Sequence, residues 1–290
     1  MRQTIESALN SLKENSSDAE IAFFGGSFTA IDRAYMRSLL DATVPYIDRF
    51  LGIRVSTRPD AIDDEALSLL RYYHVTSVEL GAQSMDDTVL SLNDRGHTAD
   101  DVRRSSSLIR SYGMELGLQM MTGLYGSTAL SDIETAQKLI ALSPDTVRIY
   151  PTIVMRYTRL CEMYERGLYS PPPLDSAVQL CAHLMTMFSN AHIRVIRVGL
   201  HDTAELRRDM VAGPYHPAFR ELCESRMMLV TLLSLLNGRE RGSYTVAVHP
   251  RDVSKLIGHK RQNLRILHDN GYDVRVIQDA AVPITTPVLR

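Results

Sequence analysis

Apolar residues along this chain follow two spacings, one typical of amphipathic helices and one typical of buried strands. Ile5, Leu9 and Leu12 recur at helical spacing and predict a helix at the start. Short apolar runs predict strands, at residues 21–24, 53–56, 77–80, 115–120, 146–150 and 193–198. Amphipathic stretches between them predict helices, at residues 32–50, 63–73, 99–112, 129–142 and 174–189. Apolar strands that alternate with helices are typical of parallel βαβ units, so the pattern predicts an α/β sheet or barrel.

The pattern changes near residue 200. A helical region is predicted over residues 203–236, in which Pro214 and Pro217 separate a short helix from a longer one. Gly238 and Gly242 bracket a linker. A smaller α+β unit follows, with a strand at 244–248, a helix at 253–267 and a strand at 274–277. We therefore expect a barrel domain over 1–200, a helical extension over 201–240 and a C-terminal subdomain over 241–290.

Composition and charge exclude several classes of protein. The 290 residues are 44% hydrophobic and 23% charged, as in ordinary globular proteins. A formal charge of −2 excludes a protein that binds polyanions by its overall charge, although a local basic patch stays open. No run approaches the roughly 18 to 20 apolar residues of a membrane span, and the start lacks an apolar signal core. We expect a cytoplasmic protein with no membrane partner.

The cysteines do not suggest a metal site. Cys161, Cys181 and Cys223 are an odd number and lie far apart, which suits neither a disulfide framework nor a closely spaced metal knuckle. We expect all three to be buried thiols, and we assign no metal-ligating residue. Convergence of the three on one metal stays open as the alternative.

Glycine-rich or polar turns follow four successive strands, at residues 25–29, 56–60, 81–84 and 122–126. Any one of them is explained by ordinary turn chemistry. In a βα barrel, however, the carboxyl ends of the strands share one face, and ligands bind at that face. Four such turns in succession therefore favour a single ligand pocket.

These segments resemble the radical S-adenosylmethionine (SAM) enzymes, in the branch of the elongator catalytic subunit and its bacterial relatives. Phe24–Thr29 is similar to the family's Gly-Gly loop, and Gln119–Gly126 to its Gln-Met-Met-x-Gly-Leu-Pro-Gly motif, with Tyr125 in place of proline. Leu92–Thr98 is similar to the branch's Asn-Arg-Gly-His-Thr connection, with Asp94 as an extra residue. The resemblance covers about residues 19–235 and implies a partial (β/α)6 TIM-like barrel.

The resemblance also implies a cofactor and its contacts. The cofactor is S-adenosylmethionine, which the family cleaves reductively to modify a substrate. The residues that match the family's cofactor contacts are Gly25, Gly26, Ser27, Thr57, Arg58, Gln83, Ser84, Gln119 and Tyr150. We identify no catalytic residue from the sequence.

One motif of the family is absent from this sequence. Family members hold a [4Fe-4S] cluster through Cys-x-x-x-Cys-x-x-Cys after the first strand, and no such motif occurs here. We therefore expect a barrel that lacks its first strand and a chain that does not cleave SAM by itself. Three explanations stay open for the exposed edge: the initial helix covers it, a second polypeptide supplies the missing strand and cluster loop, or the coding start lies upstream.

The C-terminal subdomain resembles a KH-type RNA-binding module. Gly258–Arg261 keeps the first glycine of that module's Gly-x-x-Gly loop and replaces the second by arginine. Residues 251–275 hold six Lys or Arg against three Asp, a local charge of +3. The resemblance implies contacts with tRNA or another RNA through Lys255, Gly258, Lys260, Arg261 and Arg265. A solvated helix face stays open as the alternative, as does a non-catalytic RNA- or partner-binding protein derived from the barrel.

Overall fold

The computed structural model describes residues 1–12 and 17–290, which form two compact units. One unit comprises residues 1–150 and 188–196, and the other comprises residues 151–187 and 197–290. The domain boundaries that we expect near residues 200 and 240 stay predictions. Among the described residues, no helix combines the length and apolar character that a bilayer crossing requires.

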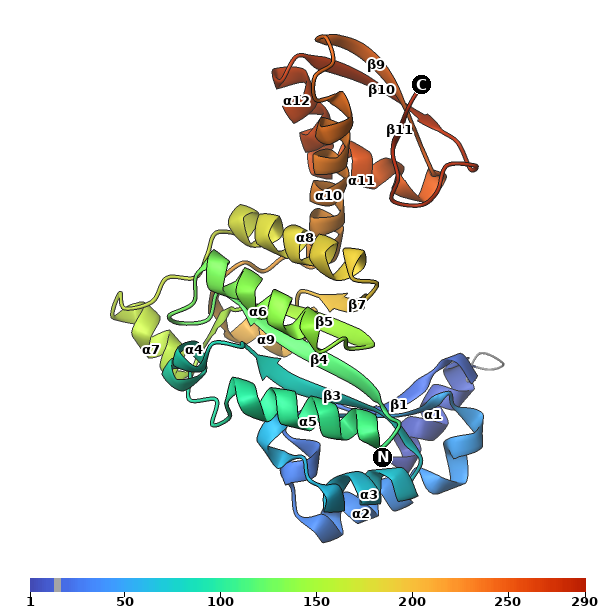
Figure 1. The fold of residues 1–290 in the computed structure, drawn as a ribbon, viewed down its shortest axis with the longest axis vertical. Helices are drawn as coiled ribbons and strands as arrows, with labels where there is room; N and C mark the ends of the chain where they lie inside the picture. Colours follow the sequence, from blue (N-terminus) through green and yellow to red (C-terminus); the bar gives the residue numbers. More distant parts are fainter. Residues whose placement is uncertain (13–16) are drawn as a thin grey trace. The chain divides into compact units, whose positions relative to one another are not determined.

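A curled sheet of six strands organises the barrel (Figure 1). Its order is β1 (Glu20–Phe23), β2 (Gly52–Thr57), β3 (Val75–Gln83), β4 (Glu115–Thr122), β5 (Thr146–Pro151) and β7 (Arg194–Val198). The pairings β1–β2, β2–β3 and β3–β4 are parallel. Val55, Val78 and Leu116 are fully buried within it. The predicted partial α/β barrel is therefore confirmed.

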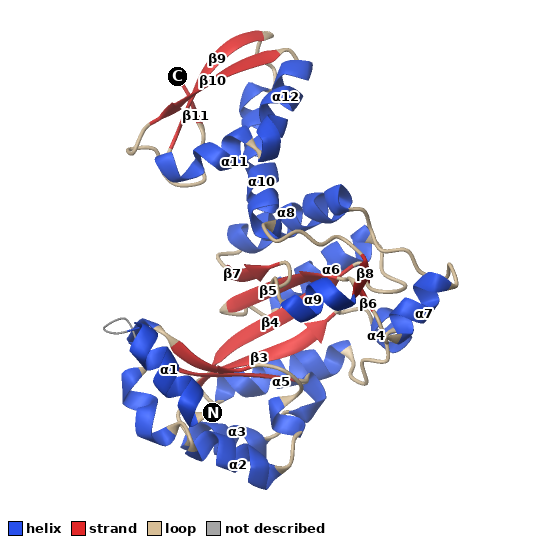
Figure 2. Ribbon diagram, turned by 180° about the vertical axis from the view of Figure 1, so that it is seen from behind, coloured by secondary structure: helices blue, strands red, loops and turns tan. Residues whose placement is uncertain are grey.

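Helices connect the parallel strands and cover the sheet. They are α1 (Arg2–Leu12), α2 (Arg33–Asp41), α3 (Asp64–Tyr72), α4 (Asp87–Leu92), α5 (Ala99–Ser111) and α6 (Ala129–Ala141). Helix α3 packs on β3, α5 on β3 and β4, and α6 on β4 (Figure 2). Their N-termini have the expected chemistry, because Asp63 accepts from Ala66 N, and Thr98 and Thr128 form capping boxes.

The sequence pattern missed some boundaries in this unit. The single helix predicted over 32–50 is wrong, because α2 ends at Asp41 and a 3-10 helix, η3, follows over Val44–Arg49. Pro45 explains the break, since it has no N–H to donate to an α-helical ladder. Strand β3 also continues through Gly81–Gln83, which the pattern placed in a turn.

The other unit begins with irregular and helical segments. It contains β6 (Val154–Met155), α7 (Arg159–Glu165), most of α8 (Leu174–Asn190), α9 (Ala204–Asp209), β8 (Met210–Ala212) and α10 (Phe219–Leu236). As predicted, the prolines before residue 219 separate α9 from α10. Strand β8, which pairs antiparallel with β6, was not predicted. Cys161, Cys181 and Cys223 are free and buried, as expected.

The C-terminal α+β subdomain is confirmed. Its elements are β9 (Gly242–Val248), α11 (Val253–Ile257), α12 (Gln262–Asp269), β10 (Tyr272–Gln278) and β11 (Val288–Leu289), with sheet order β10-β9-β11. Val246, Leu256 and Leu267 share a core with Leu232 and Leu236 of α10. The continuous helix predicted over 253–267 is wrong, because positive φ values at Gly258, Lys260 and Arg261 divide it into α11 and α12.

Candidate functional site

A polar cluster joins four neighbouring strands of the barrel. The Nε of Arg148 on β5 lies 2.6 Å from the Oε1 of Glu79 on β3. The amide of Gln119 on β4 donates to the same carboxylate and, at 3.1 Å, to the hydroxyl of Ser56 on β2. Glu79 is fully buried, and its Oε2 has no hydrogen-bond partner within the described chain. Because a buried carboxylate with a spare oxygen lone pair is costly, this cluster is suited to receive a hydroxyl or amino donor.

The cluster continues to the end of β1. The Cζ of Arg148 lies 4.8 Å from the centroid of the Phe24 ring, within cation–π range. Phe24 directly precedes the Gly-Gly loop and is 55% exposed. Sequence analysis singled out Gln119 but missed Glu79 and Arg148. The sequence could have indicated both residues, because each is the single charged residue in a short run predicted to be a strand.

The Gly-Gly loop leaves space for a ligand. Gly25 and Gly26 have φ values of +97° and +68°, and a Cβ built on either would meet no atom within 4 Å. Left-handed backbone therefore requires glycine here, and main-chain groups of the loop are open to close approach. Ser27 precedes a 3-10 turn, η2 (Phe28–Ala30), and its side chain makes no capping hydrogen bond.

Two of the residues expected to contact the cofactor, Thr57 and Ser84, have hydroxyl groups that form hydrogen bonds with neighbouring loop residues. The buried hydroxyl of Thr57 accepts from Thr29 N at 3.2 Å and lies 2.5 Å from the Thr29 hydroxyl. The buried hydroxyl of Ser84 accepts from Asp86 N and lies 3.3 Å from that of Thr135. These contacts fasten the turn after β1 to β2 and the turn after β3 to α6.

The remaining expected contacts lie at other strand ends. Arg58 pairs with Asp60, whose hydrogen bond raises the pKa of the guanidinium, and its Nη2 lies beside Gly96. Gln83 ends β3 with a φ of +62°. Tyr150 is half-buried near the end of β5. Of the expected contacts, the structure joins Gln119 to the Glu79 cluster, and it joins Thr57 to the loop that begins at Gly25.

Arg95 is a further cation at this face. Its Nη2 lies 3.0 Å from the Sδ of Met121, and its Nε is buried without a hydrogen-bond partner in the described chain. Met121 shares a strand face with Gln119, two residues before it. Burial lowers the pKa of Arg95. Thioether sulfur is a weak acceptor, so the guanidinium is suited to receive an anionic group.

The extra residue Asp94 does not displace the connection between α4 and α5 from the sheet. Asp94 adopts a φ of +51°, which accommodates one additional residue in a tight turn. The side-chain amide of Asn93 donates to Tyr125 O at 2.8 Å. The loop after β3 is thereby tied to the loop after β4.

Asp132 binds the main chain of the loop after β4. Its Oδ2 accepts from Gly123 N at 2.9 Å. Burial raises the pKa of Asp132 to about 6, against the opposing effect of this hydrogen bond. The conformation of the loop after β4 therefore depends on a carboxylate that titrates near neutral pH.

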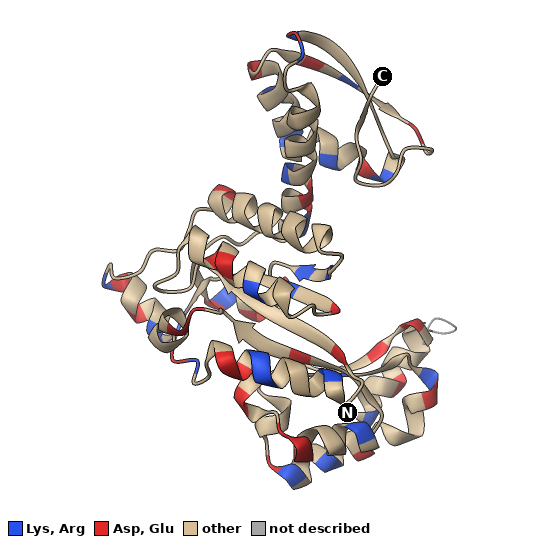
Figure 3. Cartoon of the chain, viewed as in Figure 1, with Lys and Arg blue, Asp and Glu red and all other residues tan. Residues whose placement is uncertain are grey.

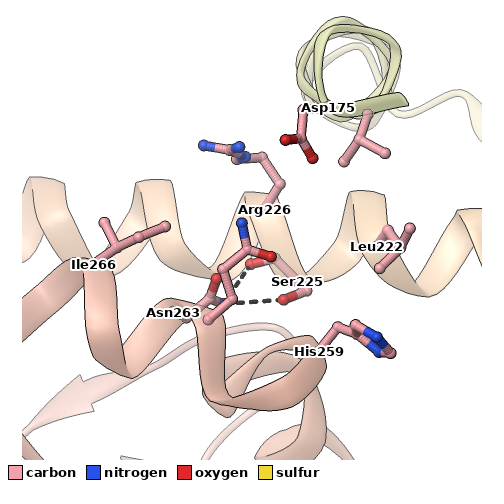
Figure 4. Close-up of a pocket in the computed structure, with 9 residues that line it drawn as sticks. Asp175, Leu222, Ser225, Arg226, His259, Asn263 and Ile266 are labelled. Atoms are coloured by element: carbon pink, nitrogen blue, oxygen red, sulfur yellow. Dashed lines mark hydrogen bonds between the residues drawn. The ribbon is translucent and has the colours of Figure 1, made fainter. Parts of the chain in front are cut away.

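The predicted RNA-binding loop has an unusual backbone. Lys260 and Arg261 are exposed and left-handed, with φ values of +48° and +60°. Gly258 has a φ of +78°, and a Cβ there would lie 2.8 Å from the Cγ of Asn263. The amide of Asn263 donates to Ser225 O and Oγ, both at 3.0 Å, which fastens α12 to α10 (Figure 4).

The other RNA candidates have protein partners. Lys255 Nζ lies 3.1 Å from Glu224 and 3.0 Å from Asp252. Arg265 donates to Lys260 O at 3.4 Å. Acidic and basic side chains are interspersed along the helices of both units (Figure 3). Of the five predicted residues, Lys260 and Arg261 have the charges best exposed to a ligand.

The cysteines do not fit an iron–sulfur cluster. Within residues 1–12 and 17–290, no three His, Cys, Asp or Glu side chains gather as a metal site. Burial raises the pKa of Cys161, and the hydrogen bond with Cys181 raises that of Cys223. Raised thiol pKa values oppose the thiolate form that iron requires.

Family models match most of the chain. The model described as the Radical SAM superfamily matches residues 3–140, and the model described as the Radical_SAM C-terminal domain matches residues 144–228.

Individual proteins also match part of the chain. The tRNA uridine(34) acetyltransferase of Dehalococcoides mccartyi is 31% identical over 52% of this chain and 33% of its own length. Human Elongator complex protein 3 is 31% identical over 76% of this chain and 43% of its own length. The chain therefore spans less than half of either relative.

A solved structure supports the fold. Archaeal Methanocaldococcus infernus Elp3 with an N-terminal deletion superposes with a TM-score of 0.69 at 23% identity, over 78% of this chain and 57% of that one.

Proposed function

Because the chain belongs to the radical SAM superfamily, we propose that the inner face of its barrel binds S-adenosylmethionine and that the protein modifies an RNA substrate. The observation that carries the first part is the buried Glu79–Gln119–Arg148 cluster, with the uncompensated Arg95 at the same face. Relatives named for tRNA modification support the second part.

The polar groups of this face match the functional groups of SAM. Main-chain groups at Gly25 and Gly26 approach the methionyl amino group. The Arg95 guanidinium receives the methionyl carboxylate, and the Glu79–Gln119 pair receives ribose hydroxyls. Ser27, Arg58, Gln83 and Tyr150 stay proposed contacts through their positions at the strand ends. Thr57 and Ser84 contribute by holding the turns. When bound, SAM supplies an activated carbon–sulfur bond next to the sheet.

Titration calorimetry with SAM tests this assignment. We expect wild-type protein to bind, and Arg95→Gln to weaken binding. Arg110→Gln, an exposed change on α5, is the matched control and should bind like wild type. Absence of binding to the wild-type protein would contradict the proposal.

The iron–sulfur chemistry of the family is a separate question from SAM binding. The three buried cysteines do not form a ligand set, so we propose that these 290 residues do not cleave SAM reductively by themselves. Anaerobic reconstitution with iron and sulfide, followed by assay for 5′-deoxyadenosine, tests this. Substantial product from this chain alone would refute it. A [4Fe-4S] cluster that serves this face would need ligands from outside these residues.

An edge of the sheet offers a place for such a contribution. Within the described chain, β1 pairs only with β2, and Phe24 beside it is largely exposed. We propose that a strand carrying the cluster loop pairs here. A peptide with that strand and the cysteine motif should bind the chain and permit cluster assembly.

RNA binding is assigned to the C-terminal subdomain. The left-handed loop at 258–261 exposes two cations, and its setting between α11 and α12 is like that of a KH module. Lys260→Glu with Arg261→Glu should abolish salt-sensitive RNA binding, whereas Arg103→Glu with Arg110→Glu on α5 should not. If the barrel binds no SAM while RNA binding persists, the alternative of a non-catalytic RNA-binding protein is favoured. A cytoplasmic location stays a prediction.

A further inference from the structure

A cleft of about 550 Å³ lies within the unit formed by residues 151–187 and 197–290, beside the loop at Gly258–Arg261. One wall is the first half of α10 with the loop before it, and the other is α11 with Gly258 and His259. The volume lies within the range of small-molecule sites, roughly 300 to 1,000 Å³. The KH-type resemblance does not account for the α10 wall.

Two imidazole rings meet at this cleft. The ring centroids of His216 and His259 are 5.9 Å apart, with an interplanar angle of 73°. His216 Nδ1 accepts from Ala218 N at 3.1 Å, so in the neutral ring the proton is on Nε2. The cleft therefore offers two flat π-surfaces and a ring N–H donor.

The charged side chains that line the cleft are mostly paired, with a small excess of cations. Glu224 pairs with Arg220 at 2.8 Å and with Lys255 at 3.1 Å, so these side chains compensate one another. Arg251 also lines the cleft and is exposed. Lys260 follows His259 directly and is exposed. Glu221, which is exposed, also lines the cleft, so Arg220, Arg251 and Lys255 stand against Glu221 and Glu224 among its charged lining residues.

Close packing fixes the loop beside the cleft. A Cβ at Gly258 would collide with Asn263, so only glycine lets the loop lie this close to α12. The left-handed residues that follow are costly for side-chain-bearing residues, and such strain is characteristic of ligand clamps.

We propose that this cleft binds a single unstacked nucleotide of single-stranded RNA. The base stacks on the exposed His259 ring and meets the half-buried His216 ring at an angle, and the adjoining phosphates contact Arg251 and Lys260. Aromatic or imidazole stacking of a splayed base is the usual way in which proteins read single-stranded RNA. The inference rests on the proposed RNA function and deepens it, because it names the form of RNA and a base pocket between the Gly258–Arg261 loop and α10.

Anisotropy titrations with an unstructured RNA oligonucleotide test the pocket. His259→Ala should weaken binding about tenfold, the effect of losing one stacked base at about 1.4 kcal/mol, and His216→Ala should weaken it less. His259→Phe should retain most of the affinity, because it keeps a stacking surface. His183→Ala, an exposed change on α8 outside the cleft, is the matched control. Duplex RNA should bind more weakly than the single strand.

A second measurement separates the pocket from the RNA function. Adenosine and uridine 5′-monophosphates are added while the histidine ring resonances are followed by NMR, and we expect shifts at His216 and His259. Oligonucleotide binding that is unchanged in both alanine variants would overturn the pocket and leave the RNA function standing. Mononucleotide shifts without oligonucleotide binding would keep the pocket and overturn the RNA function. Neither response would overturn both.

Discussion

The Arg148 guanidinium and the Glu79 carboxylate form an ion pair of 2.6 Å inside the barrel, although 69 positions separate them in the sequence. Their side chains are 13% and 1% exposed. Desolvation of two such charges is tolerated only because each compensates the other. The pair thereby supports the face where we place the cofactor.

Breaking this pair should be strongly destabilising. Glu79→Ala leaves the Arg148 cation buried without its partner, and we expect a loss of about 3 to 5 kcal/mol in the free energy of unfolding. Urea denaturation measures the loss. Glu79→Leu with Arg148→Met removes both charges and should recover much of the stability. Equal stability of the single and double variants would contradict the argument.

Arg95 should matter for binding but not for stability. Arg95→Gln removes a half-buried cation whose Nη2 contacts the Met121 sulfur and whose Nε has no hydrogen-bond partner among the described residues, so the thermal midpoint should be unchanged or higher. SAM affinity should fall about tenfold or more, because a charge-assisted contact with the carboxylate is lost. Decarboxylated SAM should bind both proteins alike. A large drop in thermal midpoint together with unchanged affinity would show a purely structural role.

Alanine variants at Gly258 and Gly238 separate the cost of left-handed backbone from the cost of a steric clash. Their φ values are nearly equal, +78° and +77°, but only at Gly258 would a Cβ collide with a neighbour. Gly238→Ala should cost about 1 to 2 kcal/mol from left-handed backbone alone. Gly258→Ala should cost distinctly more, as measured by chemical denaturation of both variants. Equal costs would mean that the Asn263 contact relaxes freely.

Asp132 should make stability depend on pH. Burial raises the pKa of Asp132 to about 6 in the folded chain, against an ordinary aspartate value of 3.8, so the folded state holds the proton more tightly. The free energy of unfolding should therefore fall as pH rises from about 4 to about 6 and then level off. Asp132→Asn should flatten that part of the profile, as followed by denaturation at several pH values. An unchanged slope in the variant would assign the dependence to other groups.

Local pattern was sufficient for the order of elements and for part of the site. Buried strands read as apolar runs whatever lies beside them, so the six strands of the sheet were predicted from short segments. The turns after the strands were recognisable because Gly25 and Gly26 need backbone that other residues avoid. Gln119 was selected through its match to the family's Gln-Met-Met motif, and the structure joins it to Glu79 and Ser56.

Side-chain partners could not be predicted in the same way. Thr57 read as a ligand contact, yet its hydroxyl meets Thr29, and Arg95 meets Met121 only because the strand order brings their loops together. The break in the predicted helix at Lys260 and Arg261 was also missed, since neither residue favours left-handed backbone.

The sequence by itself determined the alternation of strands and helices, the absence of a Cys-x-x-x-Cys-x-x-Cys motif and the glycines at the turns, since each depends on neighbouring residues alone. Only the tertiary structure decided which charges are paired and which rings meet at the C-terminal cleft. It also decided that the Nε of Arg95 is buried without a hydrogen-bond partner among the described residues. Those outcomes depend on distances between residues remote in sequence, and burial then sets the energy of each charge by removing water from it.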